Sequence, residues 1–140
     1  MKVHSINEYG KLKSVVLGRP DNAVYPKGDR FYKQWIVGNN KKKEMDHVIP
    51  QNVITQSADD LWAVKDLLED EDITIYRPEI IDHKTLNIDY RFETTGFNSW
   101  NSRDFLFTLD NLVIECPVPF SSKHRESFAY QDIKNQAIQS

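Results

Sequence analysis

A short polar stretch, residues 101–104, is the clearest candidate for recognition chemistry in the chain. It reads Asn-Ser-Arg-Asp and stands directly before a strongly apolar segment that predicts a strand. A carboxylate at the end of a strand is well placed to line a cleft, where Asp104 would bind a guanidinium or an amine through charge-assisted hydrogen bonds. The alternative is an ion pair between Arg103 and Asp104 that only caps the strand, and the local pattern favours neither reading.

The other reactive residue types predict no second site. The one cysteine, Cys116, ends an apolar strand beside Pro117, which is typical of a small buried hydrophobic residue. No two of the four histidines are close in sequence and there is no thiolate cluster, so we expect no metal. The five glycines are too scattered for a phosphate-binding loop, and we expect no cofactor. The three lysines at 41–43 favour a solvated loop.

The first half of the chain predicts a strand, a long irregular segment and a helix. Residues 14–17 are a short apolar run, typical of a strand buried on both faces. Residues 21–53 look irregular, and such long segments are usually functional or disordered. Residues 57–60 (Ser-Ala-Asp-Asp) resemble a capping box that begins a helix, which should fray in the acidic run 69–72. The apolar stripe of this helix consists of Leu61, Val64, Leu67 and Leu68.

The second half predicts a strand, a hairpin and a final helix. The strand covers residues 73–76, and the hairpin joins 105–109 to 112–116. The two-residue link, Asp-Asn at 110–111, fits a type I′ turn. The helix should run from about residue 122 to about 136, because apolar residues recur there every four positions. They are Ala129, Ile133 and Ala137. This order of elements favours an α/β fold.

Length and composition limit the class of protein. The 140 residues suit a single domain, residues 1–140, and an apolar content of 39% predicts a somewhat thin core. A net charge of −3 argues against sequence-independent binding of nucleic acid. The chain has no apolar run of transmembrane length and no signal-peptide core at its start, so we expect no membrane partner and a cytoplasmic location.

Four stretches of sequence form a pattern that covers nearly the whole chain. They are residues 7–12 leading into the first strand, residues 73–78 (Ile-Thr-Ile-Tyr-Arg-Pro), Ser102-Arg103-Asp104, and a block with Glu115, Pro117, Ser122, Lys123, Glu126, Ala129 and Tyr130. In their order and spacing they resemble the amidinotransferase family, glycine amidinotransferase and its bacterial relatives, among the guanidino-modifying enzymes. Arginine deiminases share the Arg-Asp segment and resemble the opening, whereas the block after Glu115 favours amidinotransferases.

The resemblance implies a fold, a reaction and a site. The fold would be α/β, a partial pentein (β/α-propeller) with about the first module and part of the second. A cysteine thiolate would attack the guanidinium carbon of arginine or a similar guanidino compound, and an acceptor amine would then take the amidino group. Asp104 matches the family aspartate that holds the guanidinium, and Arg103 matches the neighbouring substrate-site residue with an orienting or structural role.

The resemblance also places the nucleophile outside this chain. The family's catalytic cysteine and histidine lie downstream of the Arg-Asp segment, and neither Cys116 nor His124 matches them. We therefore predict the N-terminal part of an amidinotransferase, inactive alone. The alternative is a non-catalytic module that binds a guanidino compound or pairs with another subunit, whether a second copy or the missing C-terminal part. The residues present do not separate transfer from hydrolysis of arginine, and they do not identify the acceptor.

Overall fold

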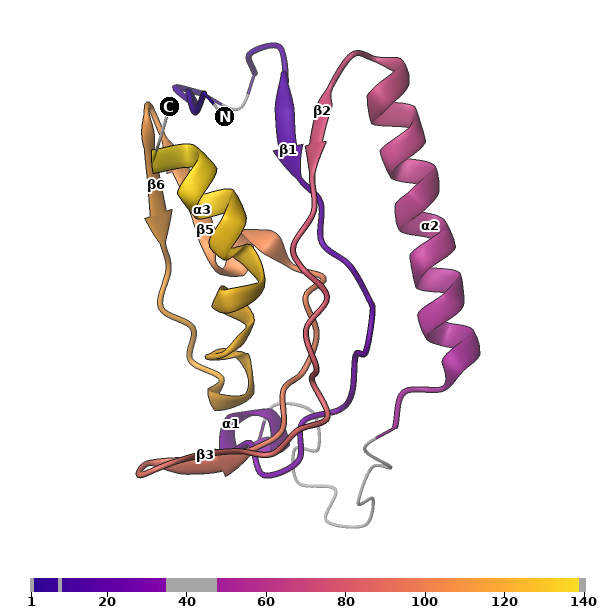
Figure 1. The fold of residues 1–140 in the computed structure, drawn as a ribbon, viewed down its shortest axis with the longest axis vertical. Coiled ribbons are helices and arrows are strands. Elements are labelled where there is room, and N and C mark those ends of the chain that lie inside the picture. Colours follow the sequence, from indigo (N-terminus) through magenta and orange to yellow (C-terminus); the bar gives the residue numbers. More distant parts are fainter. Residues whose placement is uncertain (1, 8, 35–47, 139–140) are drawn as a thin grey trace.

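Three two-stranded sheets and one long helix dominate the described part of this computed structural model, which describes residues 2–7, 9–34 and 48–138 (Figure 1). One sheet is parallel and two are antiparallel hairpins. The strands are β1 (Ser14–Val16) with β2 (Thr74–Tyr76), β3 (Asn87–Asp89) with β4 (Phe92–Thr94), and β5 (Leu106–Leu109) with β6 (Leu112–Glu115). This mixture of helices and small sheets confirms the α/β class.

Strand β1 forms where the apolar run predicts it and pairs in parallel with β2, with Val15 opposite Ile75. All three residues of β1 are only half-buried, so the prediction of a strand buried on both faces is wrong. A two-stranded sheet is too narrow to be covered on both faces. Beyond the strands, Arg19 donates to the Pro78 carbonyl oxygen (2.9 Å) and Arg77 donates to that of Gly18 (3.0 Å), which holds the two exit loops together.

Helix α2 (Gln51–Asp70) begins six residues earlier than the capping-box pattern predicts. The chain enters it at Pro50 (φ −54°), and no side chain caps its first turn. A proline at a helix start loses no hydrogen bond, because the first N–H groups of a helix have no partner within it. The predicted end is confirmed, since the Glu71 N–H donates to the Leu68 carbonyl oxygen and Asp72 takes a positive φ of 58°.

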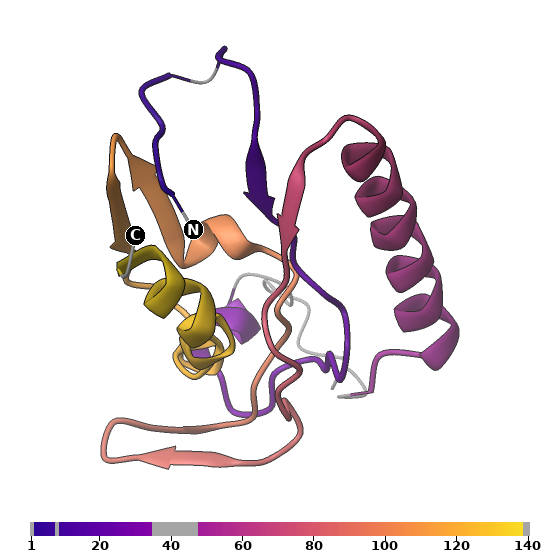
Figure 2. The same ribbon diagram turned by 45° about the horizontal axis from the view of Figure 1, so that its top comes forward.

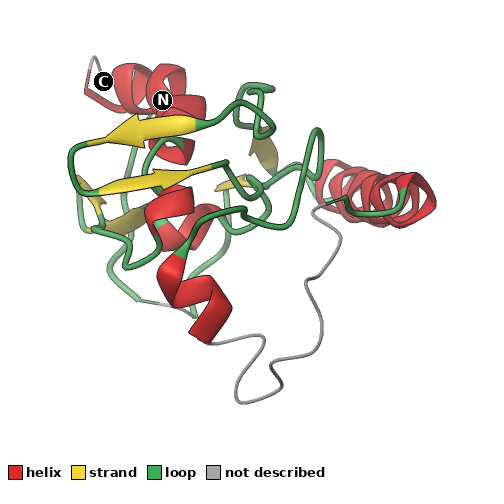
Figure 3. Cartoon of the chain, turned by 90° about the horizontal axis from the view of Figure 1, so that it is seen from below, coloured by secondary structure: helices red, strands yellow, loops and turns green. Residues whose placement is uncertain are grey.

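The apolar stripe of α2 is only partly used. Leu61 and Leu68 are half-buried against the neighbouring β2, but no residue of the helix is fully buried. Leu67 is 67% exposed and Val64 is 42% exposed. Figure 3 shows α2 set apart from the other helices and from the hairpins. In this part of the chain the core is thin, as expected, because α2 packs only against one small sheet.

The β5–β6 hairpin forms as predicted, and its register leaves Asp110 and Asn111 as the two-residue loop. Of these two only Asp110 has a positive φ (51°), so the prediction of a type I′ turn is wrong. The Asp110 backbone instead pairs with Ser5 through two hydrogen bonds of 2.7 and 2.8 Å. This bridge ties the hairpin loop to the start of the described chain and constrains the turn.

The end of the chain folds back on the hairpin (Figures 1 and 2). The predicted helix is broken into two 3₁₀ turns, η3 (Ser121–Lys123) and η4 (Glu126–Tyr130), followed by α3 (Gln131–Ile138). The rings of Phe105 and Tyr130 stack with centroids 5.6 Å apart. The buried core cluster of the molecule consists of Phe105, Ala129, Tyr130 and Ile133. The core therefore lies between the hairpin and the C-terminal helical segments.

Part of the segment predicted to be irregular is ordered by Asp29. Its buried carboxylate accepts a hydrogen bond from the Tyr32 N–H and so caps the start of the short helix α1 (Arg30–Tyr32). The same carboxylate accepts hydrogen bonds from the N–H and the hydroxyl of Ser122. The lysines at 41–43 lie outside the described residues. Within the described ranges, no helix is long and apolar enough to cross a membrane. No group of three potential metal ligands occurs in the same part of the chain.

Candidate functional site

Asp104 ends a 3₁₀ turn, η2 (Ser102–Asp104), immediately before β5. Its N–H donates to the Asn101 carbonyl oxygen (3.0 Å), and the next residue, Phe105, is 1% exposed. The buried ring anchors the turn in the core, so the carboxylate is held at a fixed place on the surface. The Asp104 side chain is 39% exposed. It is therefore both positioned by the fold and accessible to a ligand.

The partner of Asp104 is Lys123 and not its sequence neighbour. The Lys123 ammonium lies 2.6 Å from Oδ2 of Asp104. The Arg103 side chain is exposed and forms no ion pair with any described residue. The structure thus brings Asp104 together with a residue 19 positions away and leaves Arg103 apart from it. A cap made by an Arg103–Asp104 ion pair is not what holds the strand.

Lys123 is an unusual cation because its side chain is only 5% exposed. The ammonium nitrogen lies 5.7 Å from the centre of the Phe97 ring and 5.6 Å from that of Phe105. Aromatic faces attract a desolvated cation, which offsets part of the cost of burying it. Lys123 is therefore held rigidly in one place, and its hydrogen bond fixes the orientation of the Asp104 carboxylate.

A second carboxyl group, that of Glu126, lies behind Lys123. It is 1% exposed, and its Oε2 atom is 4.0 Å from the Lys123 ammonium. Its Oε1 atom accepts a hydrogen bond from the Asn98 N–H (3.0 Å), whereas Oε2 has no hydrogen-bond partner among the described residues. Burial raises the pKa of Glu126 to about 8, and the charge of Lys123 opposes this shift. At neutral pH this carboxyl is largely protonated.

Neutral buried groups surround the cluster. The Tyr130 hydroxyl donates to the Ser99 carbonyl oxygen (3.2 Å), and the Ser99 hydroxyl is 3.2 Å from Nε2 of His83. Burial raises the pKa of Tyr130 to about 12 and lowers that of His83 to about 4. Gly96 packs so tightly that an added Cβ would lie 2.8 Å from Nδ1 of His83. Near pH 7 this shell holds the cluster in place without adding charge.

The local sequence pattern singles out Asp104 as a candidate, which stays a prediction, and gives no indication of the contacts that Lys123, Glu126 and His83 make. Lys123 and Glu126 enter the sequence analysis only as letters of a family-like block. The sequence signal that could have pointed to them is the pair Lys123 and Glu126, two ionisable residues three positions apart next to apolar residues. This spacing does not indicate which side chain each of the two contacts. Cys116 is half-buried, with its sulfur 3.9 Å from the Ile114 carbonyl oxygen. His124 is exposed against the Phe92 ring.

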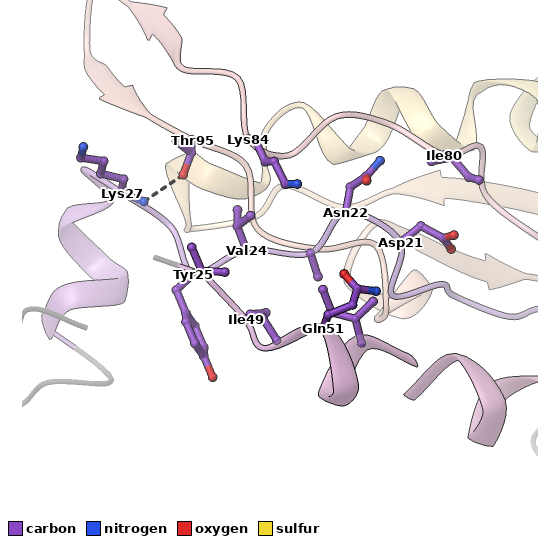
Figure 4. Close-up of a pocket in the computed structure, with 13 residues that line it drawn as sticks. Asp21, Asn22, Val24, Tyr25, Lys27, Ile49, Gln51, Ile80, Lys84 and Thr95 are labelled. Carbon is purple, nitrogen blue, oxygen red and sulfur yellow. Dashed lines mark hydrogen bonds between the residues drawn. The ribbon is translucent and has the colours of Figure 1, made fainter. Parts of the chain in front are cut away.

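A separate open cleft of about 720 Å³ lies between the loop after β1, the start of α2 and the chain around Lys84 (Figure 4). Its polar side chains include Asp21, Gln51 and Lys84, and the Lys27 N–H at its rim donates to the Thr95 hydroxyl (2.9 Å). Asp104, Lys123 and Glu126 do not line it. We place the candidate site at Asp104 and not in this cleft, because at Asp104 an accessible carboxylate is held by a buried ammonium, whereas no ion pair among the described residues that line the cleft is buried in this way.

Known proteins with similar sequences are amidinotransferases. No family model matches the chain. A mitochondrial glycine amidinotransferase from Xenopus tropicalis is 28% identical over 137 residues, which cover 94% of this chain and 32% of the relative. Inosamine-phosphate amidinotransferase 1 from Streptomyces griseus is 28% identical over 130 residues, or 91% of this chain and 38% of the relative.

The solved structures agree with the sequence relatives. An inosamine-phosphate amidinotransferase from Streptomyces griseus superposes with a TM-score of 0.86 and 27% identity. The chain resembles amidinotransferases. This match covers 99% of the chain and 40% of the solved structure. An amidinotransferase of the saxitoxin biosynthetic pathway from Microseira wollei shares the fold, with a TM-score of 0.82 at 22% identity.

The amidinotransferase-like chain spans about a third of the length of the curated relatives, and 40% of each of these solved chains. The resemblance predicted from the four stretches is thus confirmed over nearly all of this chain. The Glu8 position of the opening stretch lies outside the described residues. Because each match concerns only part of the relative, the similarity by itself gives this chain a family context and a fold.

Proposed function

We propose that the chain is the N-terminal part of an amidinotransferase and supplies the aspartate that holds the donor's guanidinium group. Residues 1–140 would form one domain, a partial pentein with about the first propeller module and part of the second. The observation that carries the proposal is the Asp104 carboxylate, 39% exposed and fixed by Lys123 at 2.6 Å, in a chain that superposes on an amidinotransferase with a TM-score of 0.86.

The proposed reaction is covalent transfer of an amidino group. A thiolate supplied by protein outside these residues attacks the guanidinium carbon of arginine, and the C–N bond to the ornithine nitrogen breaks as that nitrogen takes up a proton. An acceptor amine then attacks the amidino-cysteine carbon, loses a proton and releases the thiolate. Because Lys123 binds Oδ2 of Asp104, the guanidinium would bind through Oδ1 on the exposed side. Arg103, exposed beside Asp104, would orient the donor.

Calorimetry with arginine tests the binding step. We expect arginine to bind the wild-type chain, and Asp104→Asn to weaken binding by roughly tenfold or more, because a charge-assisted hydrogen bond contributes about 1.5–3 kcal/mol. The matched control is Asp132→Asn, an exposed carboxylate of α3. Wild-type protein that gives no binding heat, or an Asp104→Asn variant that binds as well as wild type, would contradict the proposal.

Two further experiments test the incomplete active site. The isolated chain should make no guanidinoacetate from arginine and glycine, and product above a heat-killed control would show that the nucleophile lies within these residues. Sequencing the gene on both sides of the coding segment should find a continuous reading frame with a histidine motif and a later cysteine. Unrelated flanking sequence behind a stop codon would count against an amidinotransferase.

One observation favours a second function, that of a subunit-interaction module. The β5–β6 hairpin carries an apolar face whose side chains are between 40% and 56% exposed, made of Phe107, Leu109, Leu112 and Ile114. Contiguous exposed apolar surfaces often mark interfaces. A module of this kind would bind a second copy or the rest of the propeller through this face. Light scattering that shows a monomer at all concentrations would argue against pairing between copies.

A further inference from the structure

Three ionisable side chains form a row along which exposure falls from the surface toward the core. The Asp104 side chain is 39% exposed, that of Lys123 is 5% exposed and that of Glu126 is 1% exposed. The Lys123 ammonium lies between the two carboxyl groups, 2.6 Å from Asp104 and 4.0 Å from Glu126. Each group comes from a different short turn: η2, η3 and η4. The row exists only because these three turns pack together.

The charges in this row decide what Asp104 can bind. The charges of Asp104 and Lys123 cancel one another. If Glu126 is neutral, a guanidinium therefore approaches a site without net charge, in which the Lys123 ammonium already binds one oxygen of Asp104. If Glu126 is ionised, the row carries one net negative charge. We infer that Glu126 acts through Lys123 as a positioning residue, and that a guanidinium binds at Asp104 with coupled loss of the Glu126 proton. This inference rests on the proposed function of Asp104.

The contacts of Glu126 leave its protonation state free to change. Oε1 accepts a hydrogen bond from the Asn98 N–H, and among the described residues no group donates to Oε2, which lies 4.0 Å from the Lys123 ammonium. A protonated Oε2 costs no existing hydrogen bond. An ionised Oε2 is attracted by the Lys123 ammonium. When a guanidinium binds Asp104, its positive charge neutralises that carboxylate, so the charge of Lys123 is less cancelled by Asp104 and stabilises the ionised Glu126 more strongly. Binding and deprotonation therefore favour each other, as linkage requires.

The charged and titratable neighbours of Glu126 support this assignment. Burial raises the pKa of Glu126 to about 8, Lys123 from η3 and the backbone N–H groups of Asn98 and Phe97 lower it, and Asp104 from η2 raises it. Tyr130, on the same turn, has its pKa raised to about 12. His83, which faces Lys123 from the loop before β3, has its pKa lowered to about 4. Of Glu126, Tyr130 and His83, Glu126 is the one that changes charge between pH 6 and 9.

Methylguanidine is a suitable probe because its cation stays charged throughout this range and carries no carboxylate or second amine. Its affinity for the wild-type chain should rise by roughly tenfold between pH 6 and 9, the scale of one unit charge acting across about 10 Å at an effective dielectric constant of about 20. Glu126→Gln keeps the acceptor for the Asn98 N–H but cannot ionise. It should bind at the low-pH affinity of wild type at every pH. Glu115→Gln, a variant at an exposed carboxylate of β6, should keep the wild-type profile.

The outcomes separate the inference from the proposed function. Methylguanidine affinity that is flat with pH in wild type, or that rises equally in Glu126→Gln, overturns the inference and leaves guanidinium binding at Asp104 intact. No methylguanidine binding at any pH overturns both. If Glu126→Gln fails to fold, the ¹³C shift of the Glu126 carboxyl in wild type decides. A titration midpoint above pH 7 that falls when methylguanidine is added supports the coupling, and an unchanged midpoint rejects it.

Discussion

The two halves of this molecule use apolar residues in opposite ways. The unit made of β1, α2 and β2 has a 20-residue helix with no buried residue. The unit made of η2, the β5–β6 hairpin and the C-terminal turns contains the whole buried core cluster, with Phe105 1% and Tyr130 0% exposed. The candidate site lies in the second unit. A carboxylate that must hold a ligand in one orientation needs rigid surroundings, and buried packing provides them.

The comparison also teaches that regular secondary structure is a poor guide to where this fold is well packed. Helix α2 is the longest element and is exposed, whereas the site is built on 3₁₀ turns of three to five residues. Short turns become rigid when their side chains are buried, as those of Lys123 and Glu126 are. Four measurements test whether stability and charge are concentrated in the second unit.

The largest expected effect is at the centre of the core cluster. Phe105→Ala should lower the free energy of unfolding by about 3–5 kcal/mol, because it removes a fully buried ring and leaves a cavity beside Tyr130. The matched control is Phe128→Ala, at a phenylalanine that is 61% exposed. Urea unfolding followed by circular dichroism measures both variants. Equal losses in the two would show that stability is not concentrated in this unit.

The next effect is a dependence of stability on pH that belongs to the same unit. The folded-state pKa of Glu126, about 8, lies above its ordinary value of 4.5, so folding favours the protonated form. The stability it contributes is complete below about pH 4.5 and is lost as the pH rises to about 8, by a few kcal/mol at ~1.4 kcal/mol per pH unit. His83, with its pKa lowered from 6.5 to about 4, acts oppositely and loses stability as the pH falls through that range.

Glu126 dominates the window from pH 6.5 to 8, because most of the change at His83 lies below pH 6.5. Wild-type protein should lose stability across it, and Glu126→Gln should not. The free energy of unfolding in urea, measured at half-unit steps of pH, tests this. A wild-type profile that is flat in this window, or an equal decline in the variant, would place the titrating group elsewhere.

A smaller effect is expected in the buried shell around the site. Gly96→Ala places a methyl group 2.8 Å from Nδ1 and 2.9 Å from Cα of His83, so the two segments must separate, at a cost of about 1–3 kcal/mol. Gly10→Ala is the control, since its added Cβ would meet only the Asn7 side chain, at 3.4 Å. Thermal unfolding compares the two. A Gly96→Ala variant as stable as wild type would show that the segments around His83 and Gly96 can move apart at little cost in free energy.

The smallest effect is expected on the exposed face of α2. Leu67→Ser should change the free energy of unfolding by no more than about 0.5 kcal/mol, because the side chain is already 67% exposed. Unfolding in urea at two protein concentrations is the measurement. A loss above 1 kcal/mol that grows with concentration would mean that this face is covered by another copy, which would remove the contrast between the two halves.

Local sequence determined the existence of most elements. The apolar run at 14–17 was enough to predict β1 (Ser14–Val16), and the two-residue polar link between apolar runs was enough to predict the hairpin at Asp110. The beginning of α2 was missed because two start signals competed, and Pro50 prevailed over the capping pattern at 57–60. The order of the four stretches also sufficed to predict the resemblance to amidinotransferases. The strands and the hairpin depend on neighbours within a few positions, and the resemblance depends on the order of motifs along the chain.

Tertiary structure alone decided what is buried and which charges meet. Burial of β1 and of the apolar stripe of α2 depends on the elements packed against them, and those elements are too small to cover them completely. Asp104 could be singled out from its neighbours in sequence, but its partner could not, because adjacent side chains on a tight turn point in different directions. Lys123, 19 positions away, reaches Asp104 because Phe105 and Tyr130 stack and draw η2 and η4 together. The sequence determined that an aspartate stands before β5, and the packing of the core determined that its partner is Lys123.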